Sequence, residues 1–210
     1  MPSQLCPQAK PFFPVGSEAK PVVKSVQKTT QKTTEITREE LITNVAGLLD
    51  EIIAEKGTNF TQVSEIPDMT VFHAKKLAPI SLRDYLLRFG KNTECHEDAF
   101  IYALIYLDRC ADNIEDFSLD SFNILRLILI SMVTGIKFYD DTYYKNSFYA
   151  RVGGVSVQEF NKLEQEYLCN YVDFNLYVDD ETYTSYYDDI VKFNQAKVEK
   201  SGEGQSLSKH

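Results

Sequence analysis

The sequence predicts an all-α protein, and three observations support this fold class. Two capping boxes, Thr37-x-x-Glu40 and Ser156-x-x-Glu159, each precede apolar residues at helical spacing. The segment 121–138 is apolar around almost its whole circumference, as expected for a helix in the middle of a bundle. No alternation of apolar and polar residues long enough for a strand appears between these segments. We therefore expect five or six helices around a central apolar helix.

The first predicted helix, over residues 35–57, is a flanking N-terminal helix. It starts at the first capping box, carries apolar residues at helical spacing, and ends at Gly57. After a connection comes a short amphipathic helix from Ser81, a good N-cap residue, to Phe89. Gly90 is expected to stop this helix.

Two strongly apolar helices, 94–111 and 121–138, are expected to form the centre of the protein. A polar aromatic stretch, residues 139–149, follows them. It leads to a predicted loop at Gly153-Gly154, which we interpret as a turn rather than a phosphate-binding loop.

The second capping box opens a helix that runs through Leu168, and the chain turns near Asp173. A last acidic, Tyr-rich helix is predicted over residues 179–198. Residues 1–34 are rich in Pro, Ser and Thr and hold five Lys and one Glu, which predicts a disordered basic tail. Residues 199–210 are predicted to be a second disordered tail.

Length and charge exclude several classes of partner. The 210 residues suffice for one ordinary domain with tails. The net charge is −9, and because residues 1–34 carry +4, residues 35–210 carry −13. Nucleic acids and anionic membranes both require a basic surface, so we expect neither as a partner. The apolar run 125–138 contains Arg126 and is shorter than the roughly 18 residues of a membrane span.

Catalysis finds little support in the sequence. The three His are far apart, and no phosphate-binding, nucleophile-elbow or zinc-protease motif occurs. No two Cys lie closer than 15 residues, so there is no C-x-x-C pair. Cys95, Cys110 and Cys169 are expected to be buried, reduced thiols, which favours a reducing compartment, the cytoplasm or the nucleus. We expect no catalytic residue, no metal and no cofactor.

Two charged residues stand out because their neighbours are apolar. Lys137 ends the central apolar helix, and Glu164 lies on a helix face that otherwise contributes Leu163 and Leu168. A Lys at the rim of a core often extends its charge to solvent. A Glu among apolar residues is costly unless it is paired. The two residues therefore predict either a local salt bridge or a two-charge anchor on an apolar surface that receives a partner helix.

Several segments resemble the cyclin box. They are Tyr106-Leu107-Asp108-Arg109, Gly135-Ile136-Lys137-Phe138, Leu163-Glu164-x-x-Tyr167-Leu168 and Asp173-Phe174-Asn175-Leu176. The segment Asn146-Ser147-Phe148-Tyr149-Ala150-Arg151-Val152-Gly153-Gly154-Val155-Ser156 resembles more narrowly the signature of the P/U-type cyclins, the phosphate-pathway branch of the family. The resemblance covers residues 70–178. It implies a single five-helix cyclin box there, with flanking N-terminal and C-terminal helices.

The resemblance also implies a non-catalytic, activating subunit of a cyclin-dependent protein kinase. In cyclins, a Lys near the end of the third box helix and a Glu in the fifth grip the regulatory helix of the kinase, and Lys137 and Glu164 match them. The neighbouring apolar contacts would be Phe138, Leu168 and Phe174. Protein substrates or inhibitors are the other implied partners. The alternative is a scaffold or interaction protein with the cyclin fold that activates no kinase.

Other residues have narrower expected roles. Asp141, or alternatively Asp140, would pair with kinase Arg residues that a phosphorylated activation loop normally engages, or it is a solvated loop acid. Gly153 and Gly154 are expected to be structural.

Asp108 is also expected to be structural, but its partner is open. In mitotic cyclins the matching Asp pairs with an Arg of the first box helix, and that position is Pro79 here. Arg83, Lys76 or backbone N–H groups are the candidate partners. The same departure leaves no ground for expecting the Arg-x-Leu substrate docking of mitotic cyclins.

Overall fold

The computed structural model describes residues 36–203, and the side chains within that range as far as residue 193. Its elements are α1 (Arg38–Glu55), η1 (Val63–Glu65), α2 (Leu82–Thr93), α3 (Asp98–Asn113), α4 (Ile124–Tyr139), α5 (Asn146–Gly153), α6 (Val157–Glu166), the π-helical turn η2 (Tyr167–Tyr171) and α7 (Asp180–Glu203). No strand occurs in this part of the chain, so the predicted all-α class is confirmed. The five helices α2–α6, flanked by α1 and α7, have the arrangement expected for one cyclin box.

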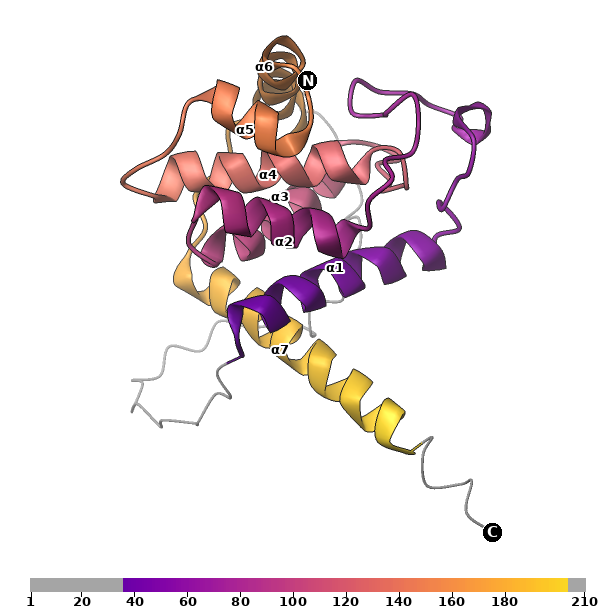
Figure 1. The fold of residues 1–210 in the computed structure, drawn as a ribbon, viewed down its shortest axis with the longest axis vertical. Helices are drawn as coiled ribbons and strands as arrows, with labels where there is room; N and C mark the ends of the chain where they lie inside the picture. The colour runs from indigo at the N-terminus through magenta and orange to yellow at the C-terminus, as the bar shows by residue number, and fades with distance from the viewer. Residues whose placement is uncertain (1–35, 204–210) are drawn as a thin grey trace, which may run out of the picture.

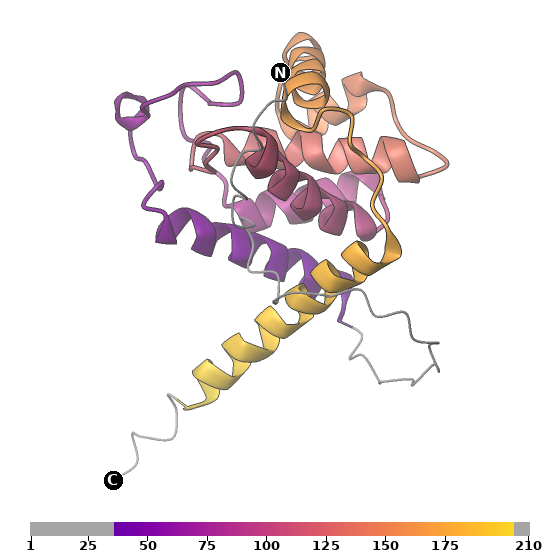
Figure 2. The same cartoon turned by 180° about the vertical axis from the view of Figure 1, so that it is seen from behind.

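The helix α4 lies at the centre of the fold, and its residues are buried from Leu127 to Ile136. It packs most extensively on α3, and α5 and α6 cover it from the other side. The helices α1 and α7 cross each other on the opposite side of the box from α5 and α6 (Figures 1 and 2). The protein is therefore a bundle whose most apolar helix is enclosed by the others.

The helix α1 begins at the predicted capping box and packs on the five-helix bundle α2–α6. The Glu40 amide donates to Thr37 Oγ1 at 3.3 Å, and the Thr37 amide donates to Glu40 Oε2 at 2.8 Å. The buried face of α1 contacts α2, α3 and α7. Residues 1–34 lie outside the described part of the chain.

The predicted end of α2 at Gly90 is wrong, because the helix continues to Thr93. Gly90 is buried, and a Cβ atom there would lie 3.2 Å from the Phe100 ring and 3.3 Å from Ile42. A glycine inside a helix lowers its propensity. Here, however, it allows α1 and α3 to approach α2 closely, and this packing outweighs the local preference.

The prediction missed a helix at the segment 146–153, which it assigned to a polar stretch and a loop. These residues form α5, with Tyr149 and Ala150 buried. Gly153 is the last residue of α5, and a Cβ atom there would lie only 2.3 Å from Leu129 of α4. Gly154 has φ +76° and caps α5 in the left-handed conformation, which glycine adopts without strain. Both glycines therefore fix how α5 ends against α4.

Two other predicted boundaries shift, and one predicted capping box is incomplete. Glu94 lies in the left-handed C-cap of α2, so the next helix starts only at Asp98. The Ser156 hydroxyl caps α6 by accepting the Glu159 amide at 3.1 Å, but the Glu159 carboxylate pairs with Arg126 instead of completing the box. The helix α7 continues to Glu203 and so includes part of the predicted C-terminal tail.

Two Tyr–Asp contacts fasten α7 to α3. The Tyr186 hydroxyl donates to Asp108 Oδ2 at 2.5 Å, and the Tyr183 hydroxyl donates to Asp98. Burial, followed by the charge of Asp108, raises the pKa of Tyr186 well above its usual value, which keeps the hydroxyl protonated as the donor. Arg83, a candidate partner of Asp108, instead pairs with Glu39 at 3.2 Å.

The expectation that three cysteines are buried holds for Cys95 and Cys110 but is wrong for Cys169. Tyr167 and Tyr171 of the π-helical turn point into the core, which leaves Cys169 between them on the outer side. Burial raises the pKa of the Cys110 thiol to about 12, so this thiol is inert at neutral pH.

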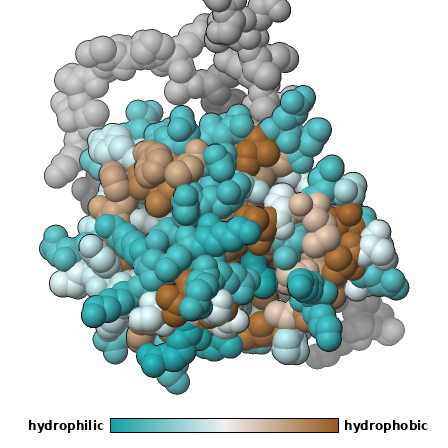
Figure 3. Space-filling model, turned by 90° about the horizontal axis from the view of Figure 1, so that it is seen from above, coloured by the Kyte–Doolittle hydropathy of each residue, from teal (hydrophilic) through white to brown (hydrophobic). Residues whose placement is uncertain are grey.

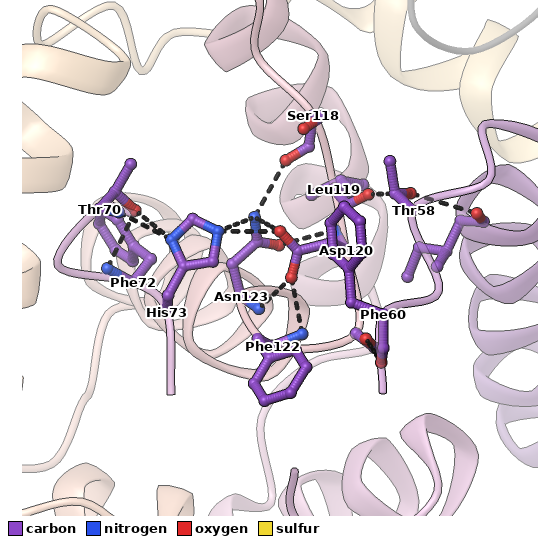
Figure 4. A network of polar contacts seen from close by, with 12 residues as sticks. Thr58, Phe60, Thr70, Phe72, His73, Ser118, Leu119, Asp120, Phe122 and Asn123 are labelled. Carbon is purple, nitrogen blue, oxygen red and sulfur yellow. Dashed lines mark hydrogen bonds and ion pairs between the residues drawn. The ribbon is translucent and has the colours of Figure 1, made fainter. Parts of the chain in front are cut away.

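A buried polar network holds the long connection between α1 and α2 against the start of α4 (Figure 4). The Thr70 amide donates to His73 Nδ1 at 2.8 Å, so the proton of the ring lies on Nε2, which donates to Asp120 Oδ2 at 2.8 Å. Asp120 Oδ1 accepts the amides of Phe122 and Asn123. Because the His73 and Asp120 side chains are only 5% and 2% exposed, water cannot replace these partners.

We expect the substitution Asp120→Ala to lower the free energy of unfolding by about 3 kcal/mol, because it leaves His73 and two amides without a buried acceptor. Urea denaturation monitored by circular dichroism measures the change. The exposed Asp68 on the same connection provides the control, and Asp68→Ala should stay within about 0.5 kcal/mol of the parent protein. Equal losses in the two variants would contradict the role of the network.

Candidate partner-binding site

Lys137 and Glu164 contact each other through side chains from two different helices. Lys137 lies in the last turn of α4, and its Nζ atom is 2.5 Å from Glu164 Oε1 on α6. The same Nζ atom is 2.5 Å from Asn146 Oδ1, and Asn146 Nδ2 donates to Glu164 Oε2 at 2.8 Å. We call Lys137, Asn146 and Glu164 the anchor network. The sequence predicted its two charges but not Asn146, which opens α5.

The anchor network is half-buried. The Lys137 and Glu164 side chains are 25% and 17% exposed, and the Lys137 ammonium lies 6.0 Å from the centre of the Phe160 ring. Partial removal of water strengthens the attraction between the charges. The charge of Lys137 also suits its position, because the C-terminus of a helix carries a partial negative charge.

An apolar cavity of about 110 Å³ opens beside the anchor network. Its walls are formed by Thr134, Lys137, Phe138, Glu164, Leu168 and Leu176. Phe138 is 48% exposed, which is unusual for a large apolar side chain at the end of a core helix. The structure thus brings together four of the predicted contact residues at one cavity and adds Leu176, which the prediction lacked.

Phe174 is exposed, as a contact residue should be, but it does not line this cavity. Its segment is held by Arg109 of α3, whose guanidinium donates to the carbonyl oxygens of Asn175 at 2.5 Å and Tyr177 at 2.8 Å. The Tyr106 hydroxyl donates to the Leu176 carbonyl at 2.8 Å. These side chains of α3 therefore position both Leu176 at the cavity and the exposed Phe174 near it.

Asp141 lies apart from the anchor network. It is exposed and lines a larger, acidic and aromatic hollow of about 790 Å³, together with Asp140, Asp98 and Glu94. Burial raises the pKa of Asp140, so Asp141 is the better solvated of the two neighbouring acids. The structure therefore separates Asp141 from the apolar cavity while keeping it just beyond the same end of α4.

Seen from the side of α5 and α6, the surface is mostly hydrophilic and is interrupted by separate hydrophobic patches (Figure 3). Within residues 36–203, no group of His, Cys, Asp and Glu is arranged to hold a metal ion. No helix of the same range is long and apolar enough to cross a membrane.

Comparisons with known proteins agree on one family. The family model for cyclins matches residues 19–176 of this chain. Cyclin-U4-1 of Arabidopsis thaliana is 32% identical over 153 residues, which are 73% of this chain and 75% of the relative. Cyclin-P3-1 of Oryza sativa subsp. japonica is 38% identical over 143 residues, 68% of this chain and 59% of the relative. The Nuc-1 negative regulatory protein preg of Neurospora crassa is 30% identical over 153 residues, 73% of this chain but 32% of the relative.

The matched range contains α1–α6 together with Lys137, Asn146 and Glu164. It also contains the segment from Asn146 to Ser156 that resembles the P/U signature. The fold, this signature and the similarity to cyclins of both named types agree, and the chain belongs to the cyclin family, as a P/U-type cyclin.

Proposed function

We propose that this chain is an activating regulatory subunit of a cyclin-dependent protein kinase, and that it binds the regulatory helix of the kinase at the apolar cavity. The observation that carries the proposal is the anchor network at the rim of that cavity. In this proposal Lys137, Glu164, Phe138, Leu168 and Phe174 contact the kinase. The chain itself contributes binding and no catalytic group.

A partner can form hydrogen bonds to the anchor network without breaking the hydrogen bonds inside it. An ammonium group has three N–H donors, and Lys137 uses two of them within the chain. Each oxygen of Glu164 accepts one hydrogen bond and keeps a free lone pair. One donor and two acceptor positions thus remain for the backbone of a partner helix. Because the side chains are already held in place, little conformational entropy is lost on binding.

The apolar residues around the network would supply most of the affinity. Phe138 and Phe174 are 48% and 62% exposed, so a partner helix that covers them removes a large apolar area from water. The cavity of about 110 Å³ has room for one aliphatic side chain of that helix. The charges at the rim would then fix the register of the helix and exclude partners with the wrong polarity.

Activation follows from differential binding. A protein kinase is active only when its regulatory helix brings a Glu to the catalytic Lys. A cyclin that binds this helix in its inward position, and less well in its outward position, shifts the population of the kinase toward the active state. The rigid packing of α4 and α6 suits this task, because it offers the helix a single fixed surface.

A scaffold that uses the same surface without activating a kinase remains the second candidate function. The two are separated by measuring the activity of the purified complex, because a scaffold leaves it at the level of the isolated kinase. Protein substrates or inhibitors are the further partners that we propose. A cytoplasmic or nuclear location fits the unpaired thiols of Cys95 and Cys110.

We expect Lys137→Ala and Glu164→Ala each to weaken kinase binding by about 30-fold or more, because each leaves a half-buried charge without its partner. The kinase is first identified by affinity purification from the source cells and mass spectrometry. Its affinity for each purified variant is then measured by calorimetry.

The matched control is Lys162→Ala, which removes an exposed Lys from the same helix as Glu164. It should bind the kinase with the parent affinity. Circular dichroism establishes that all variants keep their helices. Undiminished binding by both Lys137→Ala and Glu164→Ala would refute the proposed site.

For Asp141 we expect a different effect, on activity rather than on affinity. In this proposal Asp141, an exposed acid just beyond α4, pairs with Arg residues of the kinase that otherwise bind the phosphorylated activation loop. The variant Asp141→Ala should lower the activity of the complex formed with unphosphorylated kinase, and phosphorylation of the kinase should reduce the difference. The control Asp68→Ala should have no effect. Equal activities of the parent and Asp141→Ala complexes would remove this role.

A further inference from the structure

A surface groove of about 630 Å³ lies on the box, away from the anchor network. Its walls come from four places in the fold: the connection that precedes α2, one side of α2, the start of α4 with the residues just before it, and the turn after α5. The turn contributes Gly153, Gly154 and Val155. The groove and the apolar cavity share no lining residue.

The charges of this groove are all of one sign. Lys75, Lys76, Arg88 and Arg126 line it, and the described residues that form its walls include no Asp or Glu. This is notable because residues 35–210 carry a net charge of −13. A positive groove on a negative body attracts an acidic partner to that place on the folded part. We call this feature the basic groove.

Three of the four cations are available to a partner. Arg126 is engaged by Glu159 just outside the groove, with 2.7 Å between Nη2 and Oε1. Arg88 is exposed, donates to the Val152 carbonyl oxygen at 3.2 Å and lies 5.3 Å from the centre of the Tyr85 ring, so it is held in position without being neutralised. Lys75 and Lys76 are exposed, and no ion pair involves them within the described part of the chain.

The floor between the cations is apolar. Ile80, Leu125 and Val155 are half-buried, and Phe122 and Leu129 are buried beneath them. A volume of several hundred Å³ with an apolar floor and polar rim is typical of a site for a few side chains. The basic groove is therefore complementary to a ligand that combines negative charge with at least one apolar group.

We propose that the basic groove binds an extended acidic segment of a partner protein, in which an apolar side chain on the floor is flanked by Asp or Glu residues. The cations stand on three separate elements, so their charge is spread around the groove, which fits several carboxylates along a chain better than one phosphate. Basic motifs of the Arg-x-Leu kind are repelled by the same charges.

This proposal stands independently of kinase binding. Arg126 and Lys137 are eleven residues apart on α4, which places the two sites about 16 Å apart along the helix. A partner in the basic groove and a kinase on the anchor network can thus be bound together, which would bring the partner to the kinase.

The test uses the full chain and labelled short peptides in fluorescence anisotropy. The first peptide has a central Leu flanked by Asp and Glu, the second replaces the Leu by Ala, the third replaces the acids by Lys, and the fourth is neutral with one phosphoserine. We expect saturable binding of the first peptide that weakens as salt is added, weaker binding of the second and no binding of the third. Tighter binding of the phosphopeptide than of the first peptide would overturn the assignment to carboxylates.

The double variant Lys75→Glu/Lys76→Glu should weaken binding of the first peptide by about tenfold or more, since it reverses two of the available cations. The control Lys91→Glu/Lys162→Glu makes the same change in net charge at exposed positions outside the groove and should reduce binding less than twofold. Equal losses in the two double variants, or no saturable binding at low salt, would overturn the proposal. Both variants should capture the kinase equally well.

Discussion

The burial of α4 on every side is the constraint on which the other features of this cyclin depend. A helix with so few polar residues must be enclosed, and α3, α5 and α6 pack directly around it. Its inward Ser131 has a partner inside the core, because Ser131 Oγ lies 2.6 Å from the Tyr167 hydroxyl. Enclosure is incomplete at the first turn, where Leu125 and Arg126 are half-buried, and it ends at the last turn, where Lys137 and Phe138 reach the surface. The candidate binding site is therefore located where the central helix leaves the core.

Helical periodicity predicted the existence and type of most helices because their apolar faces are long and continuous. It misplaced the end of α2, since Gly90 is kept for close packing against Phe100, a contact between segments distant in the sequence. It missed α5 because a helix of this length has too few turns for a clear period. Cys169 was assigned to the core because local spacing does not reveal a π-helical turn.

The sequence predicted the two charged residues of the site, but it did not predict the residues that hold them and the neighbouring segment in place. Lys137 and Glu164 are conspicuous because each stands among apolar residues. Asn146 and Arg109 are ordinary polar residues in the sequence, and only the fold shows that one joins the two charges and the other holds the segment before α7. The sequence feature that could have identified Asn146 as a site residue is its position at the start of the P/U signature. Long-range hydrogen bonds of this kind produce no periodic pattern in the sequence.

The contact between Gly153 and Leu129 links two parts of the protein that serve different surfaces. Gly153 closes α5 beside the basic groove, whereas Asn146, at the other end of the same helix, joins Lys137 to Glu164. The helix has only eight residues, about 12 Å, so its two ends are joined by a short, straight rod. Because Gly153 has no Cβ atom, α5 packs closely on Leu129, and this contact sets the inclination of α5. The inclination in turn sets where Asn146 meets Lys137 and Glu164 at the other end of the helix.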